Sequence, residues 1–414
     1  MEMTPGFKRT DGSTIHEQWQ QFSLHEVCER ISVGLATSVT QHYRKSGVPI
    51  IRNLNIKDGY FDGRDLLFVT KEFADANRQK AAKALDVLTV HTGANLGDTC
   101  VLPAEFDDCH TFTTLITTPK PNLLTPQFLC LHMSSFTGKK ELARLQVGGG
   151  KGNLNTGHLR NYRIQVPPLI EQHAIAVALH DVDAILGALD RLIAKKRDLK
   201  QAAMEQLLTG QTRLPGYHGE WNVMRIGEFT DCTAGGTPST LIASYWGGSI
   251  RWMSSGEVNL KLVEEVVGRI TEEGLRNSST KLIPKKCVLI GLAGQGKTRG
   301  TVGMNLVELC TNQSIAAIFP SPAFVPEFLY YNLDARYDEL RELSAGDGGR
   351  GGLNLTIIKG IPVRLPVIPE QHSIAEVLWD MDTELVALEQ RRAKTRALKQ
   401  GMVQELLTGR TRLI

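Results

Sequence analysis

The stretch that decides the fold runs from Pro167 to Leu214 and reads PPLIEQHAIAVALHDVDAILGALDRLIAKKRDLKQAAMEQLLTGQTRL. It returns without a gap from Pro366 to Leu413 as PVIPEQHSIAEVLWDMDTELVALEQRRAKTRALKQGMVQELLTGRTRL, displaced by 199 positions and identical at about half of them. A period of this length is too long for a solenoid repeat and accommodates a domain with a connector. The repeat therefore predicts a molecule with internal pseudo-twofold character.

Each copy carries the marks of one long helix. Proline opens both copies, at Pro167–Pro168 and at Pro369, and Gly210 and Gly409 supply the stop. Between these marks apolar residues step by three and four positions, a spacing typical of a coiled-coil seam on a helix of roughly 40 residues and about 60 Å. The seam residues are Ile175, Leu179, Val182, Leu186, Leu189 and Ile193 in the first copy, and Ile374, Leu378, Met381, Leu385 and Leu388 in the second.

One apolar stripe alone would indicate a long core helix. Two matching seams in one chain favour pairing, so we expect the helices to form an antiparallel coiled coil. Basic residues crowd the C-terminal half of each helix, at Lys195–Lys200 and Arg391–Lys399. We interpret them as a solvated helix face, with contact to nucleic acid or an acidic partner as the alternative.

The duplication extends beyond the helices. Trp19 and Trp221 begin similar segments. Glycine-rich runs at 148–152 and 348–352 come shortly before the long helix of each half. The interiors between these landmarks match poorly, which suggests that the two halves recognise different things. We therefore divide the chain into a first domain at 1–166, a helix at 167–214, a second domain at 215–365 and a helix at 366–414.

Both interiors read as mixed α/β (α+β). Short apolar or β-branched runs alternate with turn signals, and 327–343 is helical in pattern. The expected fold is two mixed α/β domains joined by two long antiparallel coiled-coil helices. Pro5 before Trp19 also repeats Pro215 before Trp221, so we expect the N-terminal segment to lie where Thr411–Leu413 would continue. The expected strands are Val48–Ile51, Leu66–Val69, Val87–Val90, Thr113–Ile116, Cys287–Ile290 and Ser314–Phe319.

Composition places the chain among ordinary globular proteins with room for two or three cores. It has 414 residues, 42% of them hydrophobic and 22% charged, and a formal net charge of +3 that permits DNA binding. The sequence holds neither an apolar run long enough to span a membrane nor the pattern of a signal peptide. Seven scattered cysteines without a CxxC pair favour reduced thiols, no metal site and a cytoplasmic location.

The segment from Gly291 to Thr298, GLAGQGKT, matches the letters of a phosphate-binding P-loop. That motif needs a strand before it and a helix after it, so that loop amides and the helix N-terminus surround a phosphate. The next residues, Arg299–Gly303, place two glycines and two β-branched residues where the helix should begin. We favour a glycine-rich hairpin that presents Lys297, Thr298 and Arg299 to nucleic acid.

The sequence offers little else that indicates catalysis. It lacks HExxH, GxSxG and a dinucleotide-binding glycine motif in a βαβ setting. His173 and His372 recur in the first turn of the two long helices, and we expect them to form structural hydrogen bonds where domain and helix meet. The glycine runs at 148–152 and 348–352 are either hinges or, through Lys151 and Arg350, phosphate contacts.

Two divergent domains alternating with two repeated helices resemble the specificity subunit of type I restriction–modification enzymes. The resemblance covers essentially the whole chain and rests on the EQH and LLTGxTRL ends of both helices. It also rests on Trp221–Glu228, on the GGTPS segment at 235–239 and on the following Tyr245–Gly248. The first half departs from this pattern, because Ile31–Leu35 stands in place of GGTPS.

The resemblance implies that each domain is a target-recognition domain for one half of a bipartite double-stranded DNA site. It implies that the helices act as a ruler that fixes the spacer, and that the chain itself is not catalytic. Methylation and DNA cleavage would belong to separate modification and restriction subunits, which would bind S-adenosylmethionine, ATP and Mg²⁺. Consecutive major-groove faces repeat every ~34–36 Å, which lies within the span of such a helix.

The DNA-binding candidates are polar or basic residues in loops of both domains. They are Arg44, Lys45, Arg52, Asn53, Asn55, Lys139, Lys140, Lys151 and Asn155 in the first half, and Thr237, Ser239, Tyr245, Trp246, Arg251, Ser254, Ser255, Lys297, Thr298, Arg299, Arg350 and Asn354 in the second. The alternative functions are a P-loop NTPase with a coiled-coil arm and a structural adaptor whose helices only dimerise.

Overall fold

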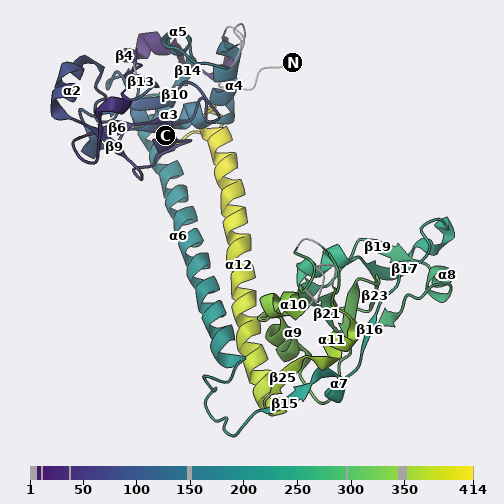
Figure 1. The fold of residues 1–414 in the computed structure, drawn as a ribbon. Helices are drawn as coiled ribbons and strands as arrows, with labels where there is room; N and C mark the ends of the chain where they lie inside the picture. The colour runs from purple at the N-terminus through teal and green to yellow at the C-terminus, as the bar shows by residue number, and fades with distance from the viewer. Residues whose placement is uncertain are drawn as a thin grey trace. The chain divides into compact units, whose positions relative to one another are not determined.

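The computed structural model describes residues 7–10, 13–36, 39–146, 152–294, 297–343 and 352–413. The chain forms two compact units. Unit 1 combines Met1–Leu189 with Arg391–Ile414, and unit 2 is Asp190–Gln390. Each unit therefore contains one recognition-sized α/β body together with one end of each long helix (Figure 1).

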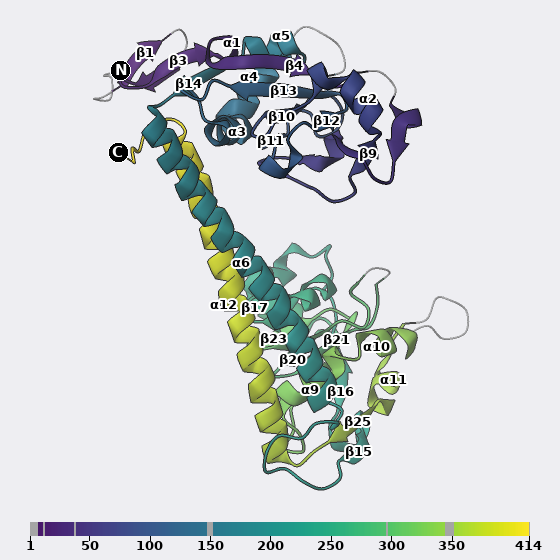
Figure 2. The same cartoon turned by 90° about the vertical axis from the view of Figure 1, so that its left-hand side faces the viewer.

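The two repeated stretches form the two longest helices of the described chain, α6 (Leu169–Leu207) and α12 (Ile368–Leu406), each of 39 residues. Both views show them side by side (Figure 2). In unit 1 Lys399 pairs with Asp183 at 2.6 Å, and in unit 2 Lys200 pairs with Asp382 at 2.6 Å. Asp183 corresponds to Asp382 in the repeat, and Lys200 corresponds to Lys399. Each helix therefore supplies the aspartate of one pair and the lysine of the other, which confirms the predicted antiparallel pairing.

The described part of unit 1 has two four-stranded sheets, and its remaining strands form the two-stranded pairs β1–β2, β3–β14 and β7–β8. The first has the order β11–β10–β13–β4 with antiparallel neighbours throughout, and the second has the order β12–β6–β9–β5. Its strands are β1 (Phe7–Thr10), β2 (Ser13–His16), β3 (Gln20–Ser23), β4 (Cys28–Val33), β5 (Tyr43–Arg44), β6 (Val48–Ile51), β7 (Ile56–Lys57), β8 (Tyr60–Phe61), β9 (Leu67–Val69), β10 (Val87–Val90), β11 (Thr99–Val101), β12 (His110–Thr111), β13 (Thr114–Pro119) and β14 (Arg163–Val166). Its short helices are α1 (Leu24–Val27), α2 (Lys71–Ala76), α3 (Pro126–Ser134), α4 (Phe136–Leu145) and α5 (Thr156–Arg160).

The body of unit 2 repeats this plan. Its first sheet, β16–β24–β21–β22–β18, contains the same antiparallel core, and its second sheet has the order β19–β17–β23–β20. Its strands are β15 (Asn222–Arg225), β16 (Cys232–Ala234), β17 (Trp246–Met253), β18 (Leu262–Val263), β19 (Gly268–Ile270), β20 (Leu282–Ile283), β21 (Val288–Gly291), β22 (Val302–Asn305), β23 (Leu309–Thr311), β24 (Ile315–Ile318) and β25 (Pro362–Leu365). Its short helices are α7 (Ile226–Phe229), α8 (Glu272–Arg276), α9 (Pro326–Asp334), α10 (Tyr337–Leu343) and α11 (Leu355–Gly360).

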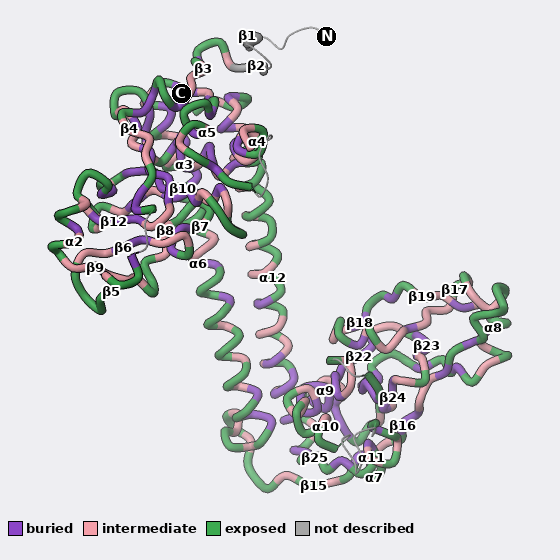
Figure 3. The backbone as a smooth tube through the Cα atoms, turned by 45° about the horizontal axis from the view of Figure 1, so that its top comes forward, coloured by how far each residue is buried: buried purple, intermediate pink, exposed green. Residues whose placement is uncertain are grey.

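The expected strands and the helical segment at 327–343 therefore exist. Val48–Ile51 and Val87–Val90 match β6 and β10 without a shift, and the ends of the other elements differ by at most three residues. The helical segment is divided between α9 and α10, because Ala335–Arg336 interrupt it. Buried residues fill the interior of each unit (Figure 3).

The predicted seam is partly a coiled coil and partly a domain core. Ile175 and Leu179 lie in the core of unit 1 with Trp19 and Phe128, and their counterparts Ile374 and Leu378 lie in the core of unit 2. Leu189, Ile193 and Leu385 are buried, whereas Val182, Leu186, Met381 and Leu388 are half-buried. The first two turns of each seam thus attach a helix to its recognition body.

Reciprocal ion pairs close both units. Arg412, beyond the end of α12, grips the buried carboxylate of Glu171 at the start of α6, and the indole of Trp19 donates to the same carboxylate at 3.1 Å. In unit 2 Arg213, beyond the end of α6, holds buried Glu370 at the start of α12 at 2.5 Å. The two junctions explain why EQH and TRL recur together. The glutamate of EQH in each copy pairs with the arginine of TRL in the other copy.

The same junctions settle two further expectations. Gly409 lies against Trp19, since a Cβ on this glycine would lie 3.2 Å from the indole ring, so 409–412 meets the N-terminal segment as predicted. Gln172 and Gln371 make the junction hydrogen bonds, to the amides of Thr125 and Val325 at 2.8 Å. The prediction that His173 and His372 form the junction hydrogen bonds is therefore wrong. Both histidines are exposed, and the glutamines that precede them form these bonds.

Candidate nucleic-acid interface

The described residues of the glycine-rich segment of unit 2, 291–294 and 297–298, lie at the end of a hairpin. Strands β21 and β22 pair antiparallel on either side of it, with Val288 opposite Met304. The Gly291 amide donates to the Thr301 carbonyl at 2.9 Å, and the Gly300 amide donates to the Gly291 carbonyl at 2.9 Å. A strand, β22, comes after the tip where a phosphate-binding loop requires a helix, so the P-loop interpretation is wrong and the predicted hairpin is confirmed.

The tip presents basic side chains, and the hairpin contacts Gly352 and Leu353 at the end of the second glycine run. Lys297 is exposed, and Thr298 and Arg299 are half-buried. The Leu353 amide, which ends that run, donates to the Leu292 carbonyl of the hairpin at 3.1 Å. Two segments that were separate candidates in the sequence therefore meet at one place on unit 2.

Unit 1 has the equivalent tip. Strands β10 and β11 pair antiparallel, and the Leu154 amide donates to the His91 carbonyl at 2.9 Å, as Leu353 does to Leu292. The exposed tip residues are Thr92, Gly93, Ala94 and Asn95, which carry hydroxyl and amide groups and no charge.

Thr92 and Asn95 are not among the DNA-binding residues predicted from the sequence. The similarity of Val87–Val90 to Val288–Ile290 was the available signal, because it aligns the loop at 91–98 with the loop at 292–301. The two units therefore present tips of the same construction and different chemistry.

Two indoles hold the loop from Gly235 to Ser239 in unit 2. Trp246 donates to the Ser239 carbonyl at 3.1 Å, and Trp252 donates to the Gly236 carbonyl at 2.9 Å. The two rings meet edge to face with centroids 5.1 Å apart. Trp246, a predicted DNA contact, therefore shapes the loop, while the exposed Ser239 side chain stays a DNA-binding candidate.

Other candidates of unit 2 are engaged with their neighbours. The Thr237 hydroxyl donates to the Gln313 side chain at 2.6 Å, and the Ser254 hydroxyl donates to Glu257 at 2.8 Å in a capping box. Arg251 pairs with Glu265 at 3.3 Å. The Val266 amide and then the guanidinium groups of Arg251 and Arg269 hold the pKa of Glu265 at about 2, so this carboxylate stays ionised.

Tyr245 and Ser255 are half-buried beside these groups and stay candidates. A Cβ on Gly274 would lie 3.0 Å from the Tyr245 Cβ, so α8 packs directly on this tyrosine.

The candidates near β6 in unit 1 divide in the same way. Arg44 and Lys45 are exposed, and Arg44 donates to the Tyr43 carbonyl at 2.8 Å. Arg52 donates to the Asp65 carbonyl at 2.6 Å, and Asn53 donates to the Thr92 carbonyl at 3.4 Å beside the hairpin tip.

Asn55 is fully buried, and its amide donates to the carbonyls of Asp62 at 3.0 Å and Arg64 at 2.9 Å. Asn55 thus shapes a loop and is withdrawn as a DNA contact.

The matched asparagines that come after the glycine runs are helix caps. Asn155 accepts from the His158 amide at 2.8 Å at the start of α5, and Asn354 accepts from the Ile357 amide at 2.9 Å at the start of α11. The cap engages only the side-chain oxygen and both residues are exposed, so they stay predictions as DNA contacts. Lys151 and Arg350 lie outside the described residues, and Lys140 is exposed.

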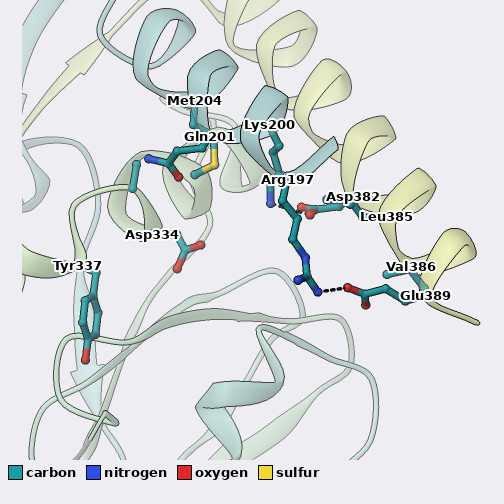
Figure 4. Close-up of a pocket in the computed structure, with 11 residues that line it drawn as sticks. Arg197, Lys200, Gln201, Met204, Asp334, Tyr337, Asp382, Leu385, Val386 and Glu389 are labelled. Atoms are coloured by element: carbon teal, nitrogen blue, oxygen red, sulfur yellow. Dashed lines mark hydrogen bonds and ion pairs between the residues drawn. The ribbon is translucent and has the colours of Figure 1, made fainter. Parts of the chain in front are cut away.

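Several basic residues of the long helices pair with acids of the other helix. Lys196 pairs with Glu384 at 2.7 Å, and Arg197 pairs with Glu389. Arg197 and Glu389, together with Lys200 and Asp382, line a cavity of about 510 Å³ in unit 2, which Tyr337 also lines (Figure 4). These basic residues form interhelical ion pairs, whereas Lys195, Arg391, Lys394 and Arg396 are exposed, as the interpretation of a solvated face expects.

Three further observations concern metal binding, membrane spans and cysteines. Among the described residues no cluster of three or more His, Cys, Asp or Glu side chains is placed to hold a metal ion. No helix in the described ranges is long and apolar enough to cross a membrane. The seven cysteines are buried free thiols.

Comparison with known proteins identifies relatives over the whole chain. The family described as "Type I restriction modification DNA specificity domain" matches residues 16–195 and 218–396. The type I restriction enzyme MjaX specificity subunit of Methanocaldococcus jannaschii is 23% identical, with 98% of this chain and 97% of that protein covered.

Two solved structures share the fold. The type I restriction–modification S subunit of M. genitalium has a TM-score of 0.60 at 15% identity, covering 98% of this chain and 99% of that one. The HsdS subunit of Thermoanaerobacter tengcongensis has a TM-score of 0.53 at 17% identity, covering 96% of this chain and 98% of that one.

Proposed function

Because the chain belongs to the type I restriction–modification DNA specificity family, we propose that each of its units reads one half of a bipartite double-stranded DNA site. The chain is the non-catalytic specificity subunit of such a system. It works with a modification subunit and a restriction subunit. The single observation that carries the proposal for this chain is the pair of equivalent hairpin tips with unlike side chains.

The two tips support different modes of DNA contact. Lys297 and Arg299 of unit 2 suit phosphate oxygens and the acceptor edge of guanine, whereas Thr92 and Asn95 of unit 1 suit base edges by hydroxyl and amide groups. Identical half-sites would require identical readers, so these tips favour an asymmetric target. The exposed Arg44, Lys45, Lys140, Asn155, Ser239 and Asn354 are further contacts that we retain in the proposal.

The experiment that tests this proposal exchanges one interior at a time. Residues 221–352 are replaced by the matching interior of a relative with a known target, and the methylated motif is sequenced from cells that also express the modification subunit. We expect one half of the motif to change while the other half and the spacer stay. A simultaneous change of both halves would refute independent reading.

We further propose that α6 and α12 set the spacer. Each helix of 39 residues is about 58 Å long at 1.5 Å per residue, more than one ~34 Å repeat of the major groove. One extra heptad after Asp190 together with one after Arg391 keeps the antiparallel seam in register. The added length of about 10 Å should widen the spacer by about three base pairs at ~3.4 Å each. An unchanged spacer with tight binding would show that the distance is set elsewhere.

We place the chemistry of the system in its partners. S-adenosylmethionine would bind the modification subunit, and ATP and Mg²⁺ would bind the restriction subunit, so the chain itself would bind no cofactor. We place the protein in the cytoplasm, where its DNA target lies and where reduced thiols such as its seven are kept.

A further inference from the structure

The last short helix before each glycine run touches the hairpin tip of its own unit. In unit 2 the Tyr337 hydroxyl of α10 donates to the Lys297 carbonyl at 3.1 Å. The same hydroxyl accepts from Arg341 at 2.8 Å, and the guanidinium lies 5.6 Å from the centre of the Tyr337 ring. One side chain of α10 is thus tied to the hairpin and to its own helix.

Unit 1 contains the equivalent contact with other residues. Lys139 of α4 donates to the Gly97 carbonyl of the hairpin at 2.9 Å. Its charge is met by Asp98 at 3.2 Å and Asp58 at 2.9 Å. Lys139, a DNA-binding candidate in the sequence, is therefore engaged within the unit and is withdrawn as a DNA contact.

A tight approach of hairpin to helix accompanies both contacts. Gly97 and Gly300 have positive φ values of 83° and 80°. A Cβ on Gly97 would lie 3.3 Å from the Leu142 side chain of α4, and one on Gly300 would lie 3.1 Å from the Arg341 side chain of α10. In both units the hairpin therefore packs against the equivalent short helix, although the contacting residues differ.

We propose that Tyr337 is a positioning residue for DNA reading by unit 2. Its hydroxyl holds the main chain at Lys297 and so determines where the exposed Lys297 side chain meets the DNA. This inference rests on the proposed function, because it takes the hairpin tip as a DNA contact. Holding the tip before binding lowers the conformational entropy that is lost on binding.

The Lys297 carbonyl has a second donor, so the conformation of the turn and its position on unit 2 depend on different hydrogen bonds. The Thr301 hydroxyl donates to it at 2.5 Å from within the hairpin. Thr301 therefore stabilises the turn itself, whereas Tyr337 ties that turn to the body of unit 2. Loss of the Tyr337 hydroxyl should leave the turn formed and its position less fixed.

A double-mutant cycle tests the inference in the complex with the modification subunit. The variants are Tyr337→Phe, Lys297→Ala and their combination, and the measurement is the Kd for duplex DNA that carries the target. Lys297→Ala should weaken binding and reduce the salt slope by about one unit. Tyr337→Phe should weaken binding by about twofold to tenfold, the range of one hydrogen bond. In the Lys297→Ala background that second loss should largely vanish, since coupled residues are not additive.

The matched control is Tyr217→Phe. Its hydroxyl also contacts a carbonyl, that of Pro369 at 3.1 Å, away from the hairpin. It should leave the Kd unchanged. Amide hydrogen exchange provides an independent measurement that does not depend on DNA. Tyr337→Phe should speed exchange at Leu353, whose amide joins the hairpin to the rest of unit 2 at the Leu292 carbonyl, and leave Gly300 and Thr301, bonded within the turn, unchanged.

Each outcome has one meaning. If Lys297→Ala leaves the Kd and the salt slope unchanged, the hairpin is no DNA contact and the contact assigned to it in the proposed function fails. If Lys297→Ala weakens binding and the Tyr337→Phe loss is equal in both backgrounds, the contact stands and the positioning role is overturned. Unchanged binding or unchanged exchange at Leu353 in Tyr337→Phe also overturns that role.

Discussion

Substitution of Arg412 by methionine should destabilise unit 1 while leaving unit 2 intact. The Glu171 carboxylate is 0% exposed and the Arg412 side chain is 16% exposed, so the pair is largely dehydrated. Methionine keeps the apolar stem of the arginine and removes its charge. The carboxylate then retains one neutral donor, the Trp19 indole at 3.1 Å.

The expected loss comes from leaving a buried charge without its partner. Breaking a buried ion pair from one side costs about 3 to 5 kcal/mol of unfolding free energy. For a unit of about 200 residues this corresponds to a fall in Tm of about 6 to 20 °C. Calorimetry of the whole chain, combined with hydrogen exchange at α3 of unit 1 and α9 of unit 2, assigns the transition to one unit.

The double variant Arg412→Met with Glu171→Gln separates charge from contact. Glutamine removes the uncompensated charge, so we expect most of the lost stability to return. Arg213→Met is the matched variant at the other junction and should destabilise unit 2 in the same way, because Glu370 is 0% exposed. If the double variant is no more stable than Arg412→Met, the reasoning from a buried charge is refuted.

Three further predictions use other parts of the chain. Purified protein should show no ATP hydrolysis that depends on Lys297, so an activity lost in Lys297→Ala would restore the NTPase alternative. Leu385→Asp should cost about 3 kcal/mol of unfolding free energy in urea, because it buries a charge, whereas Val386→Asp, on the exposed neighbour, should stay within about 0.5 kcal/mol. Burial lowers the pKa of His132 from 6.5 to about 4, so the unfolded chain binds the proton more readily between these values. Stability should therefore fall by about 3 kcal/mol as pH drops from 6.5 to 4, and His132→Phe should flatten this slope in urea titrations at each pH.

Much of the architecture was predictable because the chain repeats itself. The seam at Ile175–Ile193 and its copy at Ile374–Leu388 share one offset, so each supports the interpretation of the other. The buried strand β10 was predictable because a strand covered on both faces is an apolar run. The hairpin at 292–301 was predictable because glycines and β-branched residues come after the P-loop letters where a helix should start.

The site was less predictable, because residue type does not distinguish contacts within the chain from contacts with DNA. Asn155 and Asn354 cap helices with the same amide that could read a base, and Asn55 uses its amide inside a loop. Arg412 and Glu171 are separated by 241 positions, and only the folded chain brings them together. The contact of Tyr337 with the hairpin likewise depends on where α10 packs, which the local pattern does not specify.

The discontinuity of unit 1 has a consequence for the order of events on the ribosome. Unit 2 is one continuous segment, Asp190–Gln390, and can fold once that segment has emerged. Unit 1 is synthesised first but needs Leu406, Leu407 and Arg412 to cover its core and neutralise Glu171. Its translated residues therefore wait, incompletely packed, while some two hundred later codons are read. A nonsense codon near position 390 would accordingly prevent complete folding of unit 1, which is translated first. Unit 2, which ends at Gln390, would keep nearly all of its residues.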